Sequence, residues 1–113
     1  MKLKIGKLEY PIYLGIEAMK YLDSVYKIVD QNTGVEFGFG VGYLASNFKM
    51  FNILSLVHFI KAGTSTEQQK PSNKDIEEFI GTLDEEGLEN LFLEATEELK
   101  KQPLTRLQMK KFE

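Results

Sequence analysis

The sequence predicts a mainly helical α+β fold, in which an N-terminal β-hairpin packs on about five helices and a basic C-terminal tail follows. Three observations lead to this fold class. Apolar and polar residues alternate over the first twelve positions, apolar residues then recur every three or four positions, and turn-forming residues separate these segments. We therefore expect a single globular domain over residues 1–102 and a flexible basic tail over residues 103–113.

The length and composition fit one folded domain. The chain has 113 residues, of which 42% are hydrophobic and 27% charged, far from the composition of disordered chains. It contains no cysteine, which excludes disulfides, thiol nucleophiles and thiolate metal sites. No segment approaches the roughly 20 apolar residues of a membrane span, so we expect no membrane partner.

Charge is distributed unevenly along the chain. Residues 62–99 carry two lysines against eleven acids, whereas residues 100–113 carry five basic residues against one acid. Between Asp75 and Glu98, ten residues are acidic and none is basic. An acidic surface of this extent repels phosphates, so we expect no nucleic-acid partner.

The first elements follow from two different periodicities. Leu3 and Ile5 alternate with lysines, Gly6-Lys7 supplies a two-residue turn, and the alternation resumes to Ile12, which predicts a β-hairpin. From Gly15 to about Ile28 the spacing becomes helical. This helix should end at the turn formers of residues 30–34.

The central part of the chain should contain two helices. Residues 35–42 are rich in aromatic residues and glycine and lead into an expected helix from about Val41 to Lys49. Asn52 can cap a second helix, from Ile53 to about Ala62, whose residues are apolar almost all round. We expect this second helix to lie at the centre of the core.

Capping residues mark the last two predicted helices. Ser72 is expected as the N-cap of one helix, with Asp75 three residues later as the acid of a capping box. The inward face of this helix begins at Ile76. Asp84 is expected to cap the other, which should end before Pro103. A polar loop over residues 63–70 precedes both.

The segment Gly40–Ala45 matches the dinucleotide-binding pattern G-x-G-x-x-A, but the residues before and after it lack the other features of a dinucleotide-binding site. That pattern needs a preceding strand of a parallel sheet and an acid about 20 residues later, whereas no Asp or Glu occurs between Glu36 and Glu67. We interpret the glycines as a means of close helix packing and expect no cofactor.

The remaining sequence signals for a catalytic, metal or DNA-binding site are weak. His58 is the single histidine, lies in the most apolar predicted helix, and has no local carboxylate or cysteine for a metal site. We interpret it as a structural histidine with a hydrogen bond, and we expect neither a catalytic nor a metal site. A helix-turn-helix regulator is disfavoured because residues 41–48, its candidate recognition segment, lack lysine and arginine.

Two apolar groups are candidates for binding a partner protein. The first surrounds the glycines, and the second lies on the basic tail. The aromatic group could equally belong to the core, whereas the tail is expected to dock on a partner or on the protein itself. The candidate residues are Phe37, Phe39, Tyr43, Leu104, Leu107, Met109 and Phe112.

Short segments along most of the chain resemble one known family in their order and spacing. They are Met1-Lys2-Leu3 through Glu9-Tyr10, Gly15 with Leu22-Asp23, residues 32–40, the apolar helix from Asn52 to Ala62, residues 70–77, and Leu91-Phe92 leading to Glu97-Glu98-Leu99-Lys100-Lys101. In these features the chain resembles the tail assembly chaperones of siphoviruses and of prophages in Gram-positive bacteria.

The resemblance implies a non-enzymatic bacteriophage protein that acts in virion morphogenesis. Its expected partner is the tape-measure protein, which it would keep soluble in the host bacterial cytoplasm while the tail tube is built. The tail tube protein is a second candidate partner, and exposed hairpin edges favour self-association. The alternative function is that of a structural head-tail connector or tail-completion protein of a siphovirus.

Overall fold

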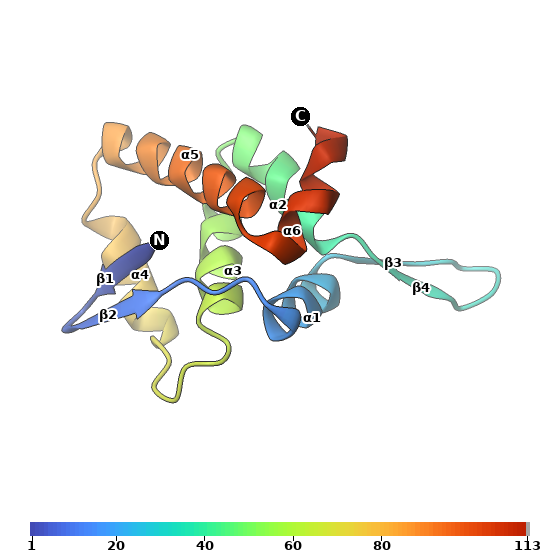
Figure 1. The fold of residues 1–113 in the computed structure, drawn as a ribbon, viewed down its shortest axis with the longest axis horizontal. Coiled ribbons are helices and arrows are strands. Elements are labelled where there is room, and N and C mark those ends of the chain that lie inside the picture. Colours follow the sequence, from blue (N-terminus) through green and yellow to red (C-terminus); the bar gives the residue numbers. More distant parts are fainter. Residues whose placement is uncertain (113) are drawn as a thin grey trace.

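The computed structural model describes residues 1–112, without the side chains of Phe37 and Phe112. The molecule measures 46 × 30 × 26 Å along its principal axes. Two separate two-stranded hairpins lie toward opposite ends of the long axis, and the helices fill the space between them (Figure 1). This arrangement confirms the predicted mainly helical α+β class, although the second hairpin was not predicted.

The first hairpin has the predicted position and register. Strands β1 (Lys2–Ile5) and β2 (Leu8–Pro11) pair antiparallel, with Leu3 opposite Tyr10, and Gly6 occupies the turn with a φ of 65°. Leu3, Ile5 and Tyr10 are buried, whereas the lysines of β1 point to solvent. Alternation of lysine and apolar residues therefore places one face of this hairpin on the core.

The second hairpin occupies a stretch for which the sequence predicted the end of a helix and an irregular segment. Helix α1 runs from Ile16 to Val25, and strands β3 (Lys27–Val29) and β4 (Glu36–Gly38) then pair antiparallel. The prediction of a helix to Ile28 was wrong in its last turn. Ile28 and Val29 continue the helical spacing, but as β-branched residues beside a strong turn they pair with β4 instead.

The turn of this second hairpin was predicted from its residues. Asp30 Oδ1 accepts a hydrogen bond from the Asn32 backbone nitrogen at 2.8 Å, and Gly34 has a φ of 73°. Such a side-chain-to-backbone bond and a left-handed glycine are what the cluster of turn formers indicated.

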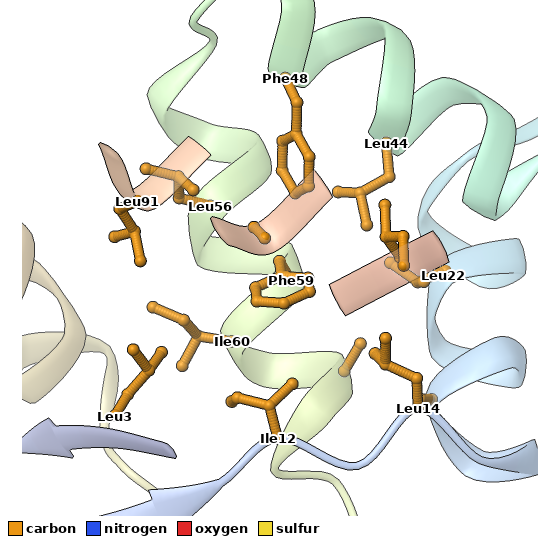
Figure 2. Packing of buried hydrophobic residues seen from close by; sticks show 14 of the residues in the cluster. Leu3, Ile12, Leu14, Leu22, Leu44, Phe48, Leu56, Phe59, Ile60 and Leu91 are labelled. Atoms are coloured by element: carbon orange, nitrogen blue, oxygen red, sulfur yellow. The ribbon is translucent and has the colours of Figure 1, made fainter. Parts of the chain in front are cut away.

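Helix α3 (Ile53–Gly63) carries the centre of the core. Asn52 caps it as predicted, its side chain accepting a hydrogen bond from the Leu54 backbone nitrogen at 3.0 Å. Leu56, Phe59 and Ile60 are fully buried, and Figure 2 shows them among side chains from the first hairpin and the neighbouring helices. The expectation of burial all round was wrong for the first turn, where Ile53 and Leu54 are exposed.

Aromatic rings join three helices around this centre. Phe48 of α2 (Gly40–Lys49) lies 5.7 Å from Phe59 of α3 and 5.8 Å from Phe92, measured between ring centroids. Phe92 belongs to α5 (Glu85–Lys101), which crosses above α3 in Figure 1. Edge-on contacts of this kind add to the burial of the rings.

The predicted caps of the later helices are present. Helix α4 (Asn73–Gly81) begins with a capping box, in which Ser72 and Asp75 each bond the other's backbone nitrogen. Asp84 caps α5 by accepting from the Gly87 nitrogen at 2.7 Å. Among the helices that the structure describes, none is long and apolar enough to cross a membrane.

The C-terminal segment is helical, which differs from the flexible tail expected over residues 103–113. Helix α6 (Pro103–Met109) and a 3₁₀ turn, η1 (Lys110–Phe112), follow α5 directly. Pro103 ends α5 but also suits the first position of a new helix, where no backbone donor is needed. Thr105 and Met109 are buried, so this segment docks on the protein itself.

A side-chain amide fixes the end of α5 to the segment after the first hairpin. Gln102 Oε1 accepts from the Leu14 backbone nitrogen at 2.7 Å, and Gln102 Nε2 donates to the Ile12 carbonyl at 2.8 Å. The same nitrogen donates to Glu98 at 2.6 Å. These bonds satisfy backbone groups of residues 12–14, which lie outside any strand.

Candidate partner-binding surface

The predicted aromatic cluster forms part of the surface. Phe39 is the N-cap residue of α2 and Tyr43 lies one turn later; both side chains remain partly exposed, at 47% and 39%. Their ring centroids are 5.8 Å apart, and Tyr43 lies 6.1 Å from Tyr26 at the end of α1. The structure therefore favours a surface cluster over a core cluster for these two residues.

Backbone contacts at the start of α2 hold this cluster in place. The Phe39 nitrogen donates to the Tyr26 carbonyl at 2.9 Å, and Asp23 Oδ1 accepts from the Gly40 nitrogen at 2.9 Å. A Cβ atom added to Gly40 would lie 2.6 Å from Leu22 Cβ. Gly40 thus permits the close approach of α1 and α2, which confirms the packing role inferred for this glycine.

Two hollows adjoin the aromatic pair. The larger, of about 390 Å³, is lined by Phe39 and by residues of α1, α2 and the C-terminal segment. The smaller, of about 180 Å³, lies between Phe39, Tyr43 and Ser46. The remaining residues that line the larger hollow are Asp23, Gly38, Gly42, Gln108 and Lys111.

The larger hollow brings together the two regions that the sequence had singled out separately. Phe39 forms one side, and Gln108 and Lys111 from the C-terminal segment form another. A partly apolar wall with a few polar groups is typical of a surface that binds another polypeptide.

The other predicted binding residues fall into three groups. Leu104 and Leu107 are exposed on α6, whereas Met109 is buried at 1% exposure and belongs to the core. Met109 is therefore not available to a partner in this structure. The side chains of Phe37 and Phe112 lie outside the described part of the chain.

His58 has the structural role that was inferred for it. Its Nδ1 lies 3.0 Å from the Tyr21 hydroxyl, and its ring packs edge-on against Tyr26 at 5.6 Å. Burial, and to a smaller degree nearby Lys61, lowers the pKa of His58 below its usual value of 6.5. Burial also raises the pKa of Tyr21, so both groups of this hydrogen bond favour the neutral form.

An exposed apolar region between α2 and α3 was missed by sequence reasoning. Met50, Phe51, Ile53 and Leu54 are all exposed there. The sequence offered one signal, the pair Met50-Phe51 immediately before a helix cap, which was overlooked because the following helix is so apolar.

A comparison with known protein families identifies the family of this chain. The model of the family described as phage tail assembly chaperone protein, TAC, matches residues 2–113. The chain belongs to this family. No curated protein and no solved structure gives a significant match.

Family membership supports a chaperone role in the assembly of phage tails and implies contact with tail proteins. The half-exposed aromatic pair of this chain is held by backbone hydrogen bonds and adjoins two hollows.

Proposed function

We propose that this chaperone binds the tape-measure protein and keeps it soluble while the tail tube is assembled. The observation that carries the proposal is the half-exposed pair of Phe39 and Tyr43 beside the larger hollow. Aromatic side chains supply much of the binding energy of protein interfaces, because a large apolar area is ordered at a low entropy cost. Long tape-measure helices with apolar faces are suitable ligands for such a surface.

The acidic helices support the same assignment. Their side chains keep the complex soluble and discourage contact with the genome, because they carry ten acids and no base between Asp75 and Glu98. We further propose that the chaperone acts in the host bacterial cytoplasm, where tails are built, and uses no catalytic group. The tail tube protein is a second proposed partner, since the growing tube forms around the tape-measure protein.

Co-expression with the tape-measure protein of the same phage tests this proposal. We expect the two proteins to copurify and the soluble fraction of the tape-measure protein to rise several-fold. The double variant Phe39→Ser/Tyr43→Ser should lose this effect. Tyr13→Ser is the matched control, because Tyr13 is also exposed but lies outside the candidate surface.

Two results would count against the proposal. In the first, the double variant rescues solubility as well as the control. In the second, the tape-measure protein stays insoluble while this chain is recovered from purified virions, which would favour the structural connector or tail-completion role.

A further inference from the structure

The outer face of α2 carries four residues at the spacing of a coiled-coil seam. Phe39, Tyr43, Ser46 and Met50 follow one another at intervals of four, three and four residues, and the first and last of them are the cap residues of α2. Residues at these intervals form one stripe along a helix, and helices whose stripes repeat in this way pack along each other. We call these four residues the α2 seam.

The seam lies on the side of α2 that faces away from the core. Val41, Leu44, Ala45 and Phe48 are buried on the opposite side, where α1, α3, α5 and α6 pack against the helix. In the seam, the two aromatic residues and Met50 are exposed and the serine is partly buried. An apolar stripe that the core does not use is a surface on which a further helix can pack.

The smaller hollow of the aromatic cluster has the composition of a hole in coiled-coil packing. Phe39, Gly42, Tyr43 and Ser46 line this space of about 180 Å³. These residues stand at positions i, i+3, i+4 and i+7 of one helix face, which is the arrangement that surrounds an inserted side chain in knobs-into-holes packing. Gly42 and Ser46 have small side chains, so the hollow can admit an apolar side chain such as leucine.

Lysines flank one side of the seam. Lys49 is exposed and follows Gly42 by seven residues, so both lie on the same side of the stripe. Lys111 of η1 and Gly42 line the larger hollow together. Asp23 also lines that hollow, where its Oδ1 accepts a hydrogen bond from the Gly40 nitrogen. Because charges beside a coiled-coil seam select partners of opposite charge, the matching helix should carry acids on the side that faces the lysines.

We propose that the α2 seam binds one amphipathic helix of the tape-measure protein by knobs-into-holes packing. The helix presents apolar residues at alternating intervals of three and four, inserts one of them into the hollow of about 180 Å³, and carries acids along one flank of this stripe. From residue 39 to residue 50 the seam spans about 16 Å, so the bound segment has about three helical turns. This binding mode rests on the proposed function, which names the partner, and deepens it by specifying the sequence pattern that the chaperone recognises.

Peptides of the tape-measure protein test the pattern directly. The probes are overlapping peptides of about 30 residues that tile the tape-measure protein of the same phage, because shorter helices are marginal in water. Fluorescence anisotropy with the purified full chain measures the dissociation constant of each peptide. Peptides that bind should share the three- and four-residue spacing with acids on one flank. Moving one central apolar residue of such a peptide by one position keeps its composition, takes the side chain out of the stripe, and should abolish binding.

The variant Ser46→Phe distinguishes a hole from a general apolar patch. The added ring would fill the hollow and make the surface more apolar. A seam that accepts an inserted side chain should then bind the peptide at least about tenfold more weakly, whereas a general apolar patch would bind it equally or more tightly. Asn90→Phe adds the same ring at an exposed position of α5 and is the matched control, which should bind like wild type. Ser46→Met fills the same space with a strong helix former and replaces Ser46→Phe if circular dichroism shows that the latter is not folded.

Charge reversal tests the flank of the seam. Lys49→Glu should weaken peptide binding by about two- to fivefold, because an ion pair at the rim of an interface contributes little. This difference from wild type should shrink in high salt, which screens exposed charges. Lys74→Glu, which reverses an exposed lysine of α4, is the matched control and should bind like wild type.

Three outcomes would overturn the assignment of the seam. They are peptide binding by Ser46→Phe as tight as that of wild type, bound peptides without the expected spacing, and a lower average mass of purified Ser46→Phe in light scattering with unchanged peptide binding. The last result would mean that the seam pairs two copies of this chain instead.

Failure of the seam and failure of the proposed function give different results. If only the seam is wrong, Phe39→Ser/Tyr43→Ser loses the solubility rescue while Ser46→Phe retains full peptide binding. If the proposed function is wrong, the wild type binds no tape-measure peptide and rescues no tape-measure protein, and the seam loses its partner as well.

Discussion

The two hairpins of the molecule have the same secondary structure but differ in what stabilises them. In the first, Leu3, Ile5 and Tyr10 face the core. In the second, every side chain of β3 is exposed, including Ile28 and Val29. An isolated two-stranded hairpin is marginal in water, so the first is stabilised by burial and the second by its turn and by its base near α1 and α2.

This difference predicts separate unfolding behaviour. The first hairpin should unfold together with the core, whereas the tip of the second can open while the rest of the molecule stays folded. Within the described part of the chain, each strand of the second hairpin also has one edge that pairs with no other strand. These edges make the hairpin available for contacts with other chains. Four predictions test the comparison.

The largest expected difference is between one isoleucine in the first strand of each hairpin, Ile5 of β1 and Ile28 of β3. Ile5→Ala should lower the free energy of unfolding by about 2 to 5 kcal/mol, because a fully packed side chain is removed. Ile28→Ala should change it by less than about 0.5 kcal/mol, because Ile28 is 45% exposed. Denaturant titration of both variants measures the difference, and equal losses would contradict the comparison.

The second prediction concerns the amide that anchors the chain after the first hairpin. Gln102→Ala leaves the Leu14 nitrogen and the Ile12 carbonyl without their side-chain partner. An unpaired buried backbone group costs about 1 to 3 kcal/mol, so we expect a loss of that size in thermal or denaturant unfolding. Gln108→Ala, which alters an exposed glutamine of α6, is the control and should unfold like wild type.

The third prediction compares the turn glycines. Gly6 and Gly34 have φ values of 65° and 73°, and a Cβ at either would meet nothing within 4 Å. Alanine should therefore cost each turn about 1 kcal/mol through backbone strain alone. Gly6→Ala should lower global stability by this amount, whereas Gly34→Ala should speed amide exchange within β3 and β4 with little global effect. A global loss of equal size in both variants would show that the second hairpin unfolds with the core.

The contrast between the hairpins also explains what the sequence could predict. The first hairpin, the Asn52, Ser72 and Asp84 caps and the core face of α3 follow from local signals, namely alternation, capping side chains and helical spacing. The second hairpin was missed because each of its strands has three residues, and Ile28 continues the spacing of α1. Pro103 was interpreted as a stop alone, although it also begins α6.

The candidate surfaces depend on long-range packing to a greater degree than the first hairpin and the helix caps do. Phe39 and Tyr43 could be named from sequence, but their exposure is set by how α1 approaches α2 across Gly40. Lys111 joins the same hollow through the docking of η1, and no local pattern encodes that contact. Phe51, which follows α2 with a φ of 55°, is exposed, and no local sequence pattern indicates this exposure.

The smallest expected effect lies at the base of the second hairpin, where His58 packs against Tyr26 and Tyr21. Burial and Lys61 lower the pKa of His58 in the folded state, so below its unfolded pKa of about 6.5 the unfolded chain takes up the proton more readily. Stability is therefore full above that pH and falls as the pH drops from 6.5 toward and past the folded pKa. A neutral imidazole can accept a hydrogen bond from the Tyr21 hydroxyl at Nδ1, whereas the protonated ring cannot.

Denaturant midpoints of the wild type and of His58→Gln between pH 7.5 and 5.5 measure this contribution, because carboxylates common to both proteins cancel in the difference. The wild type should lose more stability than the variant as the pH falls. The loss should be modest, since His58 is only partly buried and solvent screens its charge. Faster exchange at the β3–β4 base in the same pH range would place the effect at this hairpin, whereas identical pH profiles for the two proteins would show that His58 does not couple proton uptake to folding.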